Sequence, residues 1–185
     1  AYARTVSPFQ NSEMMASGPP SADELKLLEP FRGKVPEEVF GEAILPPVSD
    51  GSGQDRVLLR KASQLLSDAG CVIKDKKRLL PDGDVFKIEF LLDEVSFQPH
   101  HGAFLKNLGT LGIDAGIRLI DAVQFRARVE DFDFDMTTQR LPISATPGDS
   151  IRPTFSAEAA KTKGSYNLAG IADPALVAAI GSLLV

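Results

Sequence analysis

The chain has 185 residues and a hydrophobic content of 43%, which is the length of one ordinary domain and enough apolar material for a core. Its 20 basic and 25 acidic residues give a net charge of -5. The two signs are interspersed, so no basic stripe is available to follow a phosphate backbone. We therefore expect no nucleic-acid partner.

The only cysteine, Cys71, lies in an apolar stretch and has no second cysteine for an intrachain disulfide. It is therefore predicted to be a buried packing residue. No apolar run is long enough to span a bilayer, and no leader-like segment opens the chain. Because the chain starts without methionine and stops in an apolar stretch, we interpret it as an excised piece of a longer protein, so the missing leader is compatible with export.

Proline and short polar clusters dominate the first part of the chain, so residues 1–50 are predicted to be an irregular wrapping segment. Within it, Ser21 stands at a helix N-cap position with Glu24 three residues later, which predicts a short helix near 22–29. A second helix is predicted over 54–69, where apolar residues recur at helical spacing, and Gly70 is expected to end it.

The middle of the chain alternates between strand and helix patterns. A strand, a tight turn around Asp82-Gly83 and a returning strand are predicted over 79–86, and the returning strand continues to Leu92. The elements that follow are a helix over 99–111, a strand over 113–120, a helix over 122–129 and a strand over 132–138. This alternation is typical of parallel strands joined by helical crossovers, so residues 51–185 are predicted to form an α/β core with a mixed, mainly parallel sheet flanked by helices.

The last part of the chain is predicted to be mostly helix and loop. A weak helix is expected near 156–161. Asp173 followed by Pro174 is typical of an N-cap with proline at the first helical position, and it predicts a helix over 175–184.

No pattern of catalytic residues is found in the sequence. The glycines at 109, 112 and 116 occur in the wrong order for dinucleotide binding. His100 and His101 are adjacent on a helix, where their side chains diverge, and they are interpreted as solvated residues at its start. Asp131, Asp133 and Asp135 alternate on a predicted strand and could share one face toward a divalent cation, but an acidic edge is the favoured interpretation. We expect no catalytic residue, no metal site and no cofactor.

Short segments spread over nearly the whole chain carry a family resemblance. In the first half they are Asn11-Ser12-Glu13, Ala16-Ser17-Gly18, Leu28-Glu29-Pro30-Phe31, Pro46-Pro47 and Asp50-Gly51-Ser52-Gly53. In the second half they are Asn107-Leu108, Leu111-Gly112-Ile113, Phe132-Asp133-Phe134-Asp135-Met136, Pro147-Gly148, Ala169-Gly170-Ile171 and Asp173-Pro174. With these segments the chain resembles the family 5 solute-binding proteins of ABC importers, the peptide and nickel group, and in particular its oligopeptide-type branch.

The resemblance implies one lobe of a two-lobed periplasmic protein. Residues 1–185 would form a single C-terminal lobe of the type II periplasmic-binding-protein kind. The whole protein would close over a peptide or peptide-like solute and deliver it to the membrane permease of an ABC importer. It would be a monomer, exported to the periplasm, and not an enzyme, since closure over a solute requires no catalytic group.

The stretch that follows the strand over 132–138 is the first candidate for ligand contact, because open α/β sheets bind ligands at the carboxyl ends of their strands. Gln139, Arg140 and Ser144 lie in this stretch. Arg140 can hold a carboxylate through two hydrogen bonds. A structural role at the surface is the alternative interpretation of Arg140.

Five further candidates follow from the resemblance. Tyr166 and Asn167 match the cleft region of the family, and Arg4, Asn11 and Ser12 match the segment that crosses between the lobes. The amide of Asn167 can both donate to and accept from a ligand amide. A role in stabilising a turn is the alternative for Asn167.

The sequence departs from the family at one point. In typical members, the resemblance implies, the loop after the matching strand carries an Asp that binds the free amino group of the ligand. Residues 140–146 contain no acidic residue, so the solute is expected to be a modified peptide, an anionic conjugate or another solute. Two alternatives remain open: a sensory or interaction module that uses the lobe without transport, and an enzyme that uses the acidic strand with a metal.

Overall fold

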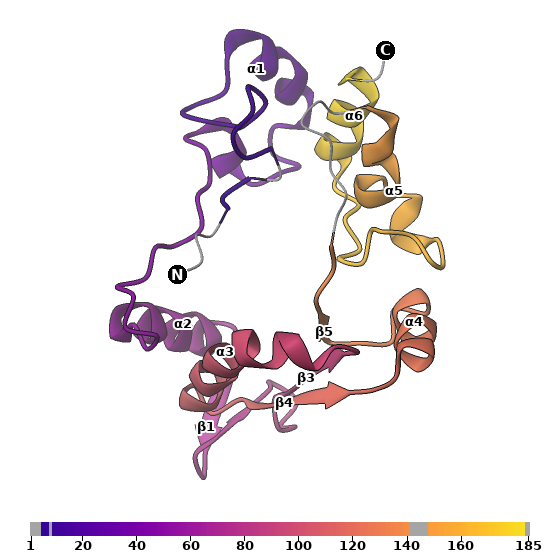
Figure 1. Cartoon of the computed structure of the whole chain (residues 1–185). Helices are drawn as coiled ribbons and strands as arrows, with labels where there is room; N and C mark the ends of the chain where they lie inside the picture. The colour runs from indigo at the N-terminus through magenta and orange to yellow at the C-terminus, as the bar shows by residue number, and fades with distance from the viewer. Residues whose placement is uncertain (1–4, 8, 141–147, 184–185) are drawn as a thin grey trace. The chain divides into compact units, whose positions relative to one another are not determined.

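The computed structural model describes residues 5–7, 9–140 and 148–183 (Figure 1). The chain divides into two compact units. Residues 1–46 and 140–185 form the helical unit, and residues 47–139 form the sheet unit. The prediction of one lobe over 1–185, with a wrapping segment over 1–50 and a core over 51–185, stays a prediction.

The helical unit is built from short helices joined by turns. The α-helices are α1 (Ala22–Leu28), α5 (Arg152–Phe155) and α6 (Pro174–Leu183), and α6 packs against both of the others. Short 3-10 helices occupy Glu29–Phe31, Glu37–Phe40, Asp149–Ile151 and Ala159–Lys161. In the described part of the first segment, the longest element is the seven-residue helix α1.

The predicted helix starts in this unit are correct. The Ser21 hydroxyl accepts a hydrogen bond from the Glu24 N–H, and the Glu24 carboxylate accepts one from the Ser21 N–H, which is the expected capping box. The Asp173 carboxylate accepts hydrogen bonds from the N–H groups of Ala175 and Leu176 at the start of α6. The weak helix predicted near 156–161 is the 3-10 turn over Ala159–Lys161.

The sheet unit contains the strands of the described residues. Its elements are α2 (Arg56–Asp68), β1 (Val72–Lys74), β2 (Lys77–Leu79), β3 (Lys87–Leu92), α3 (Gln98–Thr110), β4 (Asp114–Leu119), α4 (Ala122–Glu130) and β5 (Met136–Thr137). A 3-10 turn over Val95–Phe97 precedes α3. Strands β1 and β2 form an antiparallel hairpin, and a separate sheet has the order β4-β3-β5 with both pairings parallel. The predicted α/β fold with helical crossovers is thus confirmed.

Strand β3 is the centre of the sheet unit. It pairs along its whole length with β4, from Lys87 opposite Asp114 to Leu92 opposite Leu119, and its Phe90 pairs with Met136 of β5. Its last three residues are buried, and Leu91 is 0% exposed. Cys71 is also buried, as predicted. The core therefore surrounds the carboxyl half of β3.

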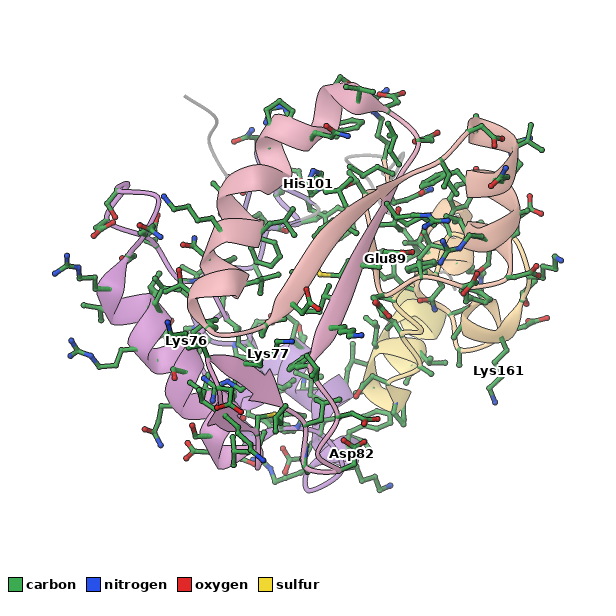
Figure 2. The ribbon with its side chains drawn as sticks, turned by 90° about the horizontal axis from the view of Figure 1, so that it is seen from below. Lys76, Lys77, Asp82, Glu89, His101 and Lys161 are labelled. Carbon is green, nitrogen blue, oxygen red and sulfur yellow. The ribbon has the colours of Figure 1, made fainter. Side chains whose placement is uncertain are left out.

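The two crossover helices lie on opposite faces of this sheet. The ring of Phe90 contacts the rings of His101 and Phe104 on α3, whereas the neighbouring Glu89 forms an ion pair with Arg128 on α4. Because successive strand residues point to opposite faces, α3 covers one face and α4 the other. Figure 2 shows His101 and Glu89 with the strand between them.

A buried arginine connects the hairpin to the helices. Arg78 of β2 is 1% exposed, and its guanidinium donates to the carbonyl of Leu111 at the end of α3 and to the hydroxyl of Ser63 on α2. Its main-chain N–H donates to the carbonyl of Gly112 at 2.7 Å. Arg78 therefore holds α2, β2 and the end of α3 together.

The predicted strand pair over 79–86 is only partly correct. A turn does form at Asp82-Gly83, but the residues on its two sides form only an isolated bridge, between Leu79 and Val85, and not a ladder. A ladder of paired residues forms earlier in the chain, between β1 and β2, which make a hairpin. Its turn consists of Asp75 and Lys76, both with positive φ, which is the geometry of a two-residue hairpin turn. The hairpin was not predicted from the sequence, because residues 74–78 around this turn are all charged and show no alternation of apolar residues.

Among the residues that the structure describes, no helix has the length and apolar character needed to cross a membrane.

Candidate functional site at the carboxyl edge of the sheet

The carboxyl ends of three parallel strands meet at one edge of the sheet unit. Asp93 follows β3, Ile120 and Asp121 follow β4, and Thr138 and Gln139 follow β5. We call this the carboxyl edge. Open α/β sheets bind their ligands at such an edge, where polar groups of the loops can face a cleft.

Two hydrogen bonds hold the end of β5 in place. The hydroxyl of Thr137 donates to the carbonyl of Leu91 on β3 at 3.0 Å. The Nε2 atom of His101 lies 3.0 Å from the hydroxyl of Thr138, and its Nδ1 atom lies 2.6 Å from the carbonyl of Phe97. The direction in which Gln139 and Arg140 leave the sheet is therefore set by contacts to β3 and α3.

The interpretation of His101 as a solvated helix-end residue was wrong. Its side chain is half-buried, with the ring centroid 4.4 Å from that of Phe90. The reason is that α3 begins at Gln98 and packs over the sheet from its first turn. His100, the neighbour, is exposed. Hydrogen bonding of His101 to Thr138 is a tertiary contact that the sequence did not indicate.

The predicted acidic strand was also wrong, since β5 covers only Met136–Thr137. Asp131 caps the end of α4, the carboxylate of Asp133 accepts from Arg128 Nε at 2.8 Å, and that of Asp135 accepts from the N–H of Glu89. Asp131 makes its cap contact through its main-chain N–H, which donates to the carbonyls of Ala127 and Val129, so the three residues have separate partners. No group of three acidic, His or Cys residues that could hold a metal ion is found in the part of the chain that the structure describes.

Gln139 and Arg140 stand where the chain passes from the sheet unit to the helical unit. Both side chains are exposed. Of the other candidates, Ser144 and Arg4 lie outside the described residues. Asp93 and Glu94, which the sequence analysis did not single out, are exposed residues directly after β3 at the same edge as Gln139. Their position could have been inferred from the predicted end of that strand.

Tyr166 and Asn167 share one loop of the helical unit but differ in burial. Tyr166 is 48% exposed, and Asn167 is 1% exposed. The amide of Asn167 donates to the carbonyls of Ser156 and Ile171 and accepts from the N–H of Ile171. Asn167 therefore has the turn-stabilising contacts of the alternative interpretation, and Tyr166 is the exposed member of the pair.

Asn11 and Ser12 form part of a turn in the helical unit. Asn11 is exposed and adopts a positive φ of 65°, a conformation that asparagine tolerates better than most residues. The hydroxyl of Ser12 donates to the carbonyl of Phe9 at 2.8 Å and accepts from the N–H of Met14. Ser12 thus stabilises the turn that presents Asn11.

Curated relatives match the chain from end to end. It is 39% identical over 184 residues to a protein of Brucella melitensis, covering 99% of this chain. It is 34% identical over 184 residues to the "Probable peptide-binding protein YejA" of Agrobacterium fabrum, again covering 99%. It is 32% identical over 185 residues to the peptidoglycan-binding protein YepA of the same organism, covering 100%. In each case the chain spans 30% of the length of the relative. These names are those of binding proteins, as we expected. No family model matches the chain.

Solved structures confirm the fold. An oligopeptide-binding protein of Thermotoga maritima, solved with bound mannohexaose, covers 90% of this chain with a TM-score of 0.58 and 16% identity, and the match spans 30% of that protein. AppA of Bacillus subtilis, solved with a nonapeptide, covers 66% of the chain and matches over 25% of its own length, with a TM-score of 0.56 and 17% identity. Both names are those of oligopeptide-binding proteins, and the likeness shows the fold of this chain.

Proposed function

The chain belongs to the family 5 solute-binding proteins, and on that premise we propose that it forms part of the component of an ABC importer that captures a peptide or peptide-like solute in the periplasm. It would do so as one lobe of a two-lobed protein. The permease of the importer would be its partner in the membrane. Binding would proceed by closure of the lobes and without covalent chemistry.

One observation carries this proposal. Gln139 and Arg140 leave the carboxyl edge from a strand end that is held by Thr137 and His101. A guanidinium on a positioned backbone can bind a carboxylate or phosphate through two parallel hydrogen bonds. Asp93 and Glu94 are exposed carboxylates that follow β3 at the carboxyl edge, and they can accept hydrogen bonds from N–H groups of a solute.

The names of the relatives support a solute that contains peptide bonds. One relative is named for peptide binding and another for peptidoglycan binding. Because residues 140–146 contain no acidic residue, we propose that a modified peptide or an anionic peptide conjugate is a better solute than a plain peptide held by its amino terminus. A sensory module that uses the same lobe without transport is the alternative.

Native mass spectrometry of the full-length protein, purified from the periplasm, tests the proposal. The expected result is a co-purified solute of peptide-like mass, with fragment ions that identify its amino acids. A protein that arrives empty and whose unfolding temperature is unchanged by peptide and peptidoglycan-fragment libraries would contradict it. A sensory domain found on the same polypeptide, together with normal uptake in a deletion strain, would favour the alternative.

The proposed ligand contact of Arg140 is tested by calorimetry with the identified solute. We expect Arg140→Ala in the full-length protein to weaken binding by about 1 to 3 kcal/mol, because a charged hydrogen bond to the solute is lost. Arg126→Ala is the matched control, since Arg126 is exposed on α4, and its affinity should be unchanged. Equal affinities for the two variants would remove Arg140 from the site.

A further inference from the structure

A groove of about 270 Å³ opens on the sheet unit between α2 and α3. Leu58, Leu59 and Ala62 line it from α2, and Phe104, Leu108 and Leu111 line it from α3 and its end. The lining is largely apolar. Because α3 runs from the carboxyl edge back to the start of β4, this groove lies toward the amino ends of the strands and is separate from the candidate ligand site.

Helix α2 has the sequence of a helix that is covered on one side. Its apolar residues recur at helical spacing, yet none of its residues is buried. Leu58, Leu59 and Ala62, which line the groove from this helix, are half-buried, and Phe104 on the facing wall is 43% exposed. An amphipathic helix in a folded protein normally buries its apolar stripe against a neighbour. The contacts that α2 makes with α3 and β2 therefore leave part of that stripe uncovered.

A polar atom in the groove lacks a partner. Asn107, which also lines the groove, donates from Nδ2 to the carbonyl of Gly53 at 3.1 Å. Its Oδ1 atom is buried and accepts no hydrogen bond from any of the described residues. Buried acceptors in folded proteins are nearly always satisfied. The occupant of the groove should therefore bring an N–H or O–H donor along with apolar side chains.

The length of the relatives bears on what covers this groove. The relatives that this chain matches are about three times as long as it is. A large amount of polypeptide is thus available to cover this surface within one molecule.

We propose that the groove between α2 and α3 is an internal docking surface, filled in the full-length protein by a segment of the same polypeptide that lies outside these 185 residues. That segment places apolar side chains against Leu59 and Ala62 and donates a hydrogen bond to Asn107 Oδ1. A solute is a poorer occupant, because a peptide would bring many polar groups to a lining that offers few. The proposal does not depend on which solute the protein binds.

Photocrosslinking in the full-length protein tests this assignment. Leu59 is replaced by p-benzoylphenylalanine, and Arg60, the exposed neighbour on the opposite side of α2, is replaced in the control. After irradiation, digestion and mass spectrometry, we expect Leu59 to crosslink to one peptide from outside this chain's 185 residues, at a yield at least about fivefold above the control. A yield equal to the control, a crosslinked dimer or a crosslink to a solute would each overturn the proposal.

A second variant tests whether the segment binds in the groove itself. Ala62→Phe fills the groove, so it should lower the Leu59 crosslink yield several-fold, whereas Arg60→Phe in the Leu59-labelled protein should leave it unchanged. Far-ultraviolet circular dichroism shows whether each variant is folded. A folded Ala62→Phe protein with an unchanged crosslink would place the segment elsewhere. Solute affinity is measured on the same proteins, so failure of the transport proposal would be seen separately.

Discussion

The same residue type serves different purposes according to its burial in this protein. Arg78 is buried, and it donates only to neutral acceptors, a carbonyl and a hydroxyl. Arg140 is exposed at the passage between the two units. The guanidinium of Arg78 is therefore not accessible to a ligand, whereas the side chain of Arg140 is exposed. The sequence alone offers no sign of this difference.

The first prediction concerns the stabilising role of Arg78. Arg78→Leu should lower the opening free energy of the α2 amides by about 3 kcal/mol, because the carbonyl of Leu111 and the hydroxyl of Ser63 lose their buried donor. Native-state hydrogen exchange measures this free energy. Arg60→Leu, on the exposed side of α2, should change it by less than about 0.5 kcal/mol. Similar effects of the two variants would show that Arg78 contributes little.

At the scale of the element, helix ends determine where the chain turns. Helices α2 and α3 both end in the same way: the N–H of the residue after a glycine donates to a carbonyl in the last turn, from Cys71 to Leu66 and from Ile113 to Leu108. Gly70 and Gly112 both have positive φ, which this helix ending requires. The first of these endings was predicted, because Gly70 follows a clear helical pattern.

The second prediction compares two glycines near the end of α3. Gly112→Ala should cost about 2 kcal/mol, because φ is +82° and a Cβ would lie 3.0 Å from the main-chain nitrogen of Arg78. Gly109→Ala, inside α3 with nothing within 4 Å of its Cβ position, should stabilise the helix by up to about 1 kcal/mol. Hydrogen exchange of the α3 amides measures both. Effects of the same sign would contradict this account.

The third prediction concerns pH and the start of α2. Hydrogen bonds from the N–H groups of Leu58 and Asp50 lower the pKa of Asp55 below its ordinary value. The ionised cap is therefore favoured in the folded state, and its stabilisation is complete above the ordinary pKa and is lost as pH falls through the lowered pKa. We expect α2 amide protection to decline in that acidic range. Asp55→Asn, which retains the cap without titrating, should show a smaller decline, and identical pH profiles would contradict the prediction.

At the scale of the whole molecule, strand β3 differs in burial from the first segment of the chain. Phe90, Leu91 and Leu92 are all buried, and β3 is paired on both sides. Among the described residues up to 46, by contrast, none is buried. Regions with little buried apolar surface open more readily than a central strand.

The fourth prediction follows from this difference. In native-state hydrogen exchange of the full-length protein, the amides of Leu91 and Leu92 should exchange at least about 100-fold more slowly than those of the turn around Ser12 and Met15, since opening β3 requires disruption of the central sheet. Mass spectrometry of overlapping peptic peptides measures the two rates in one experiment. Comparable rates would mean that the turn is held by contacts beyond its own hydrogen bonds.

The sequence by itself determined the elements whose signals are local. The capping box at Ser21, the helix that ends at Gly70, the N-cap at Asp173 and the alternation around β3 and β4 are all present as predicted. Propensity, capping and periodicity act over a few residues, so they can be recognised without a fold. The family was also recognisable, because its motifs are spread over nearly the whole chain.

Only the tertiary structure decided which polar side chains form hydrogen bonds within the fold. Arg78 donates to Leu111, and His101 contacts Thr138, which are residues distant in the chain. Asp135 accepts from Glu89 and Asn167 donates to Ser156, which likewise lie apart in the sequence. Burial and hydrogen-bond partners are properties of packed surfaces, and no local pattern specifies them. The physical reason is that a polar group's availability for a ligand depends on what the rest of the fold places beside it.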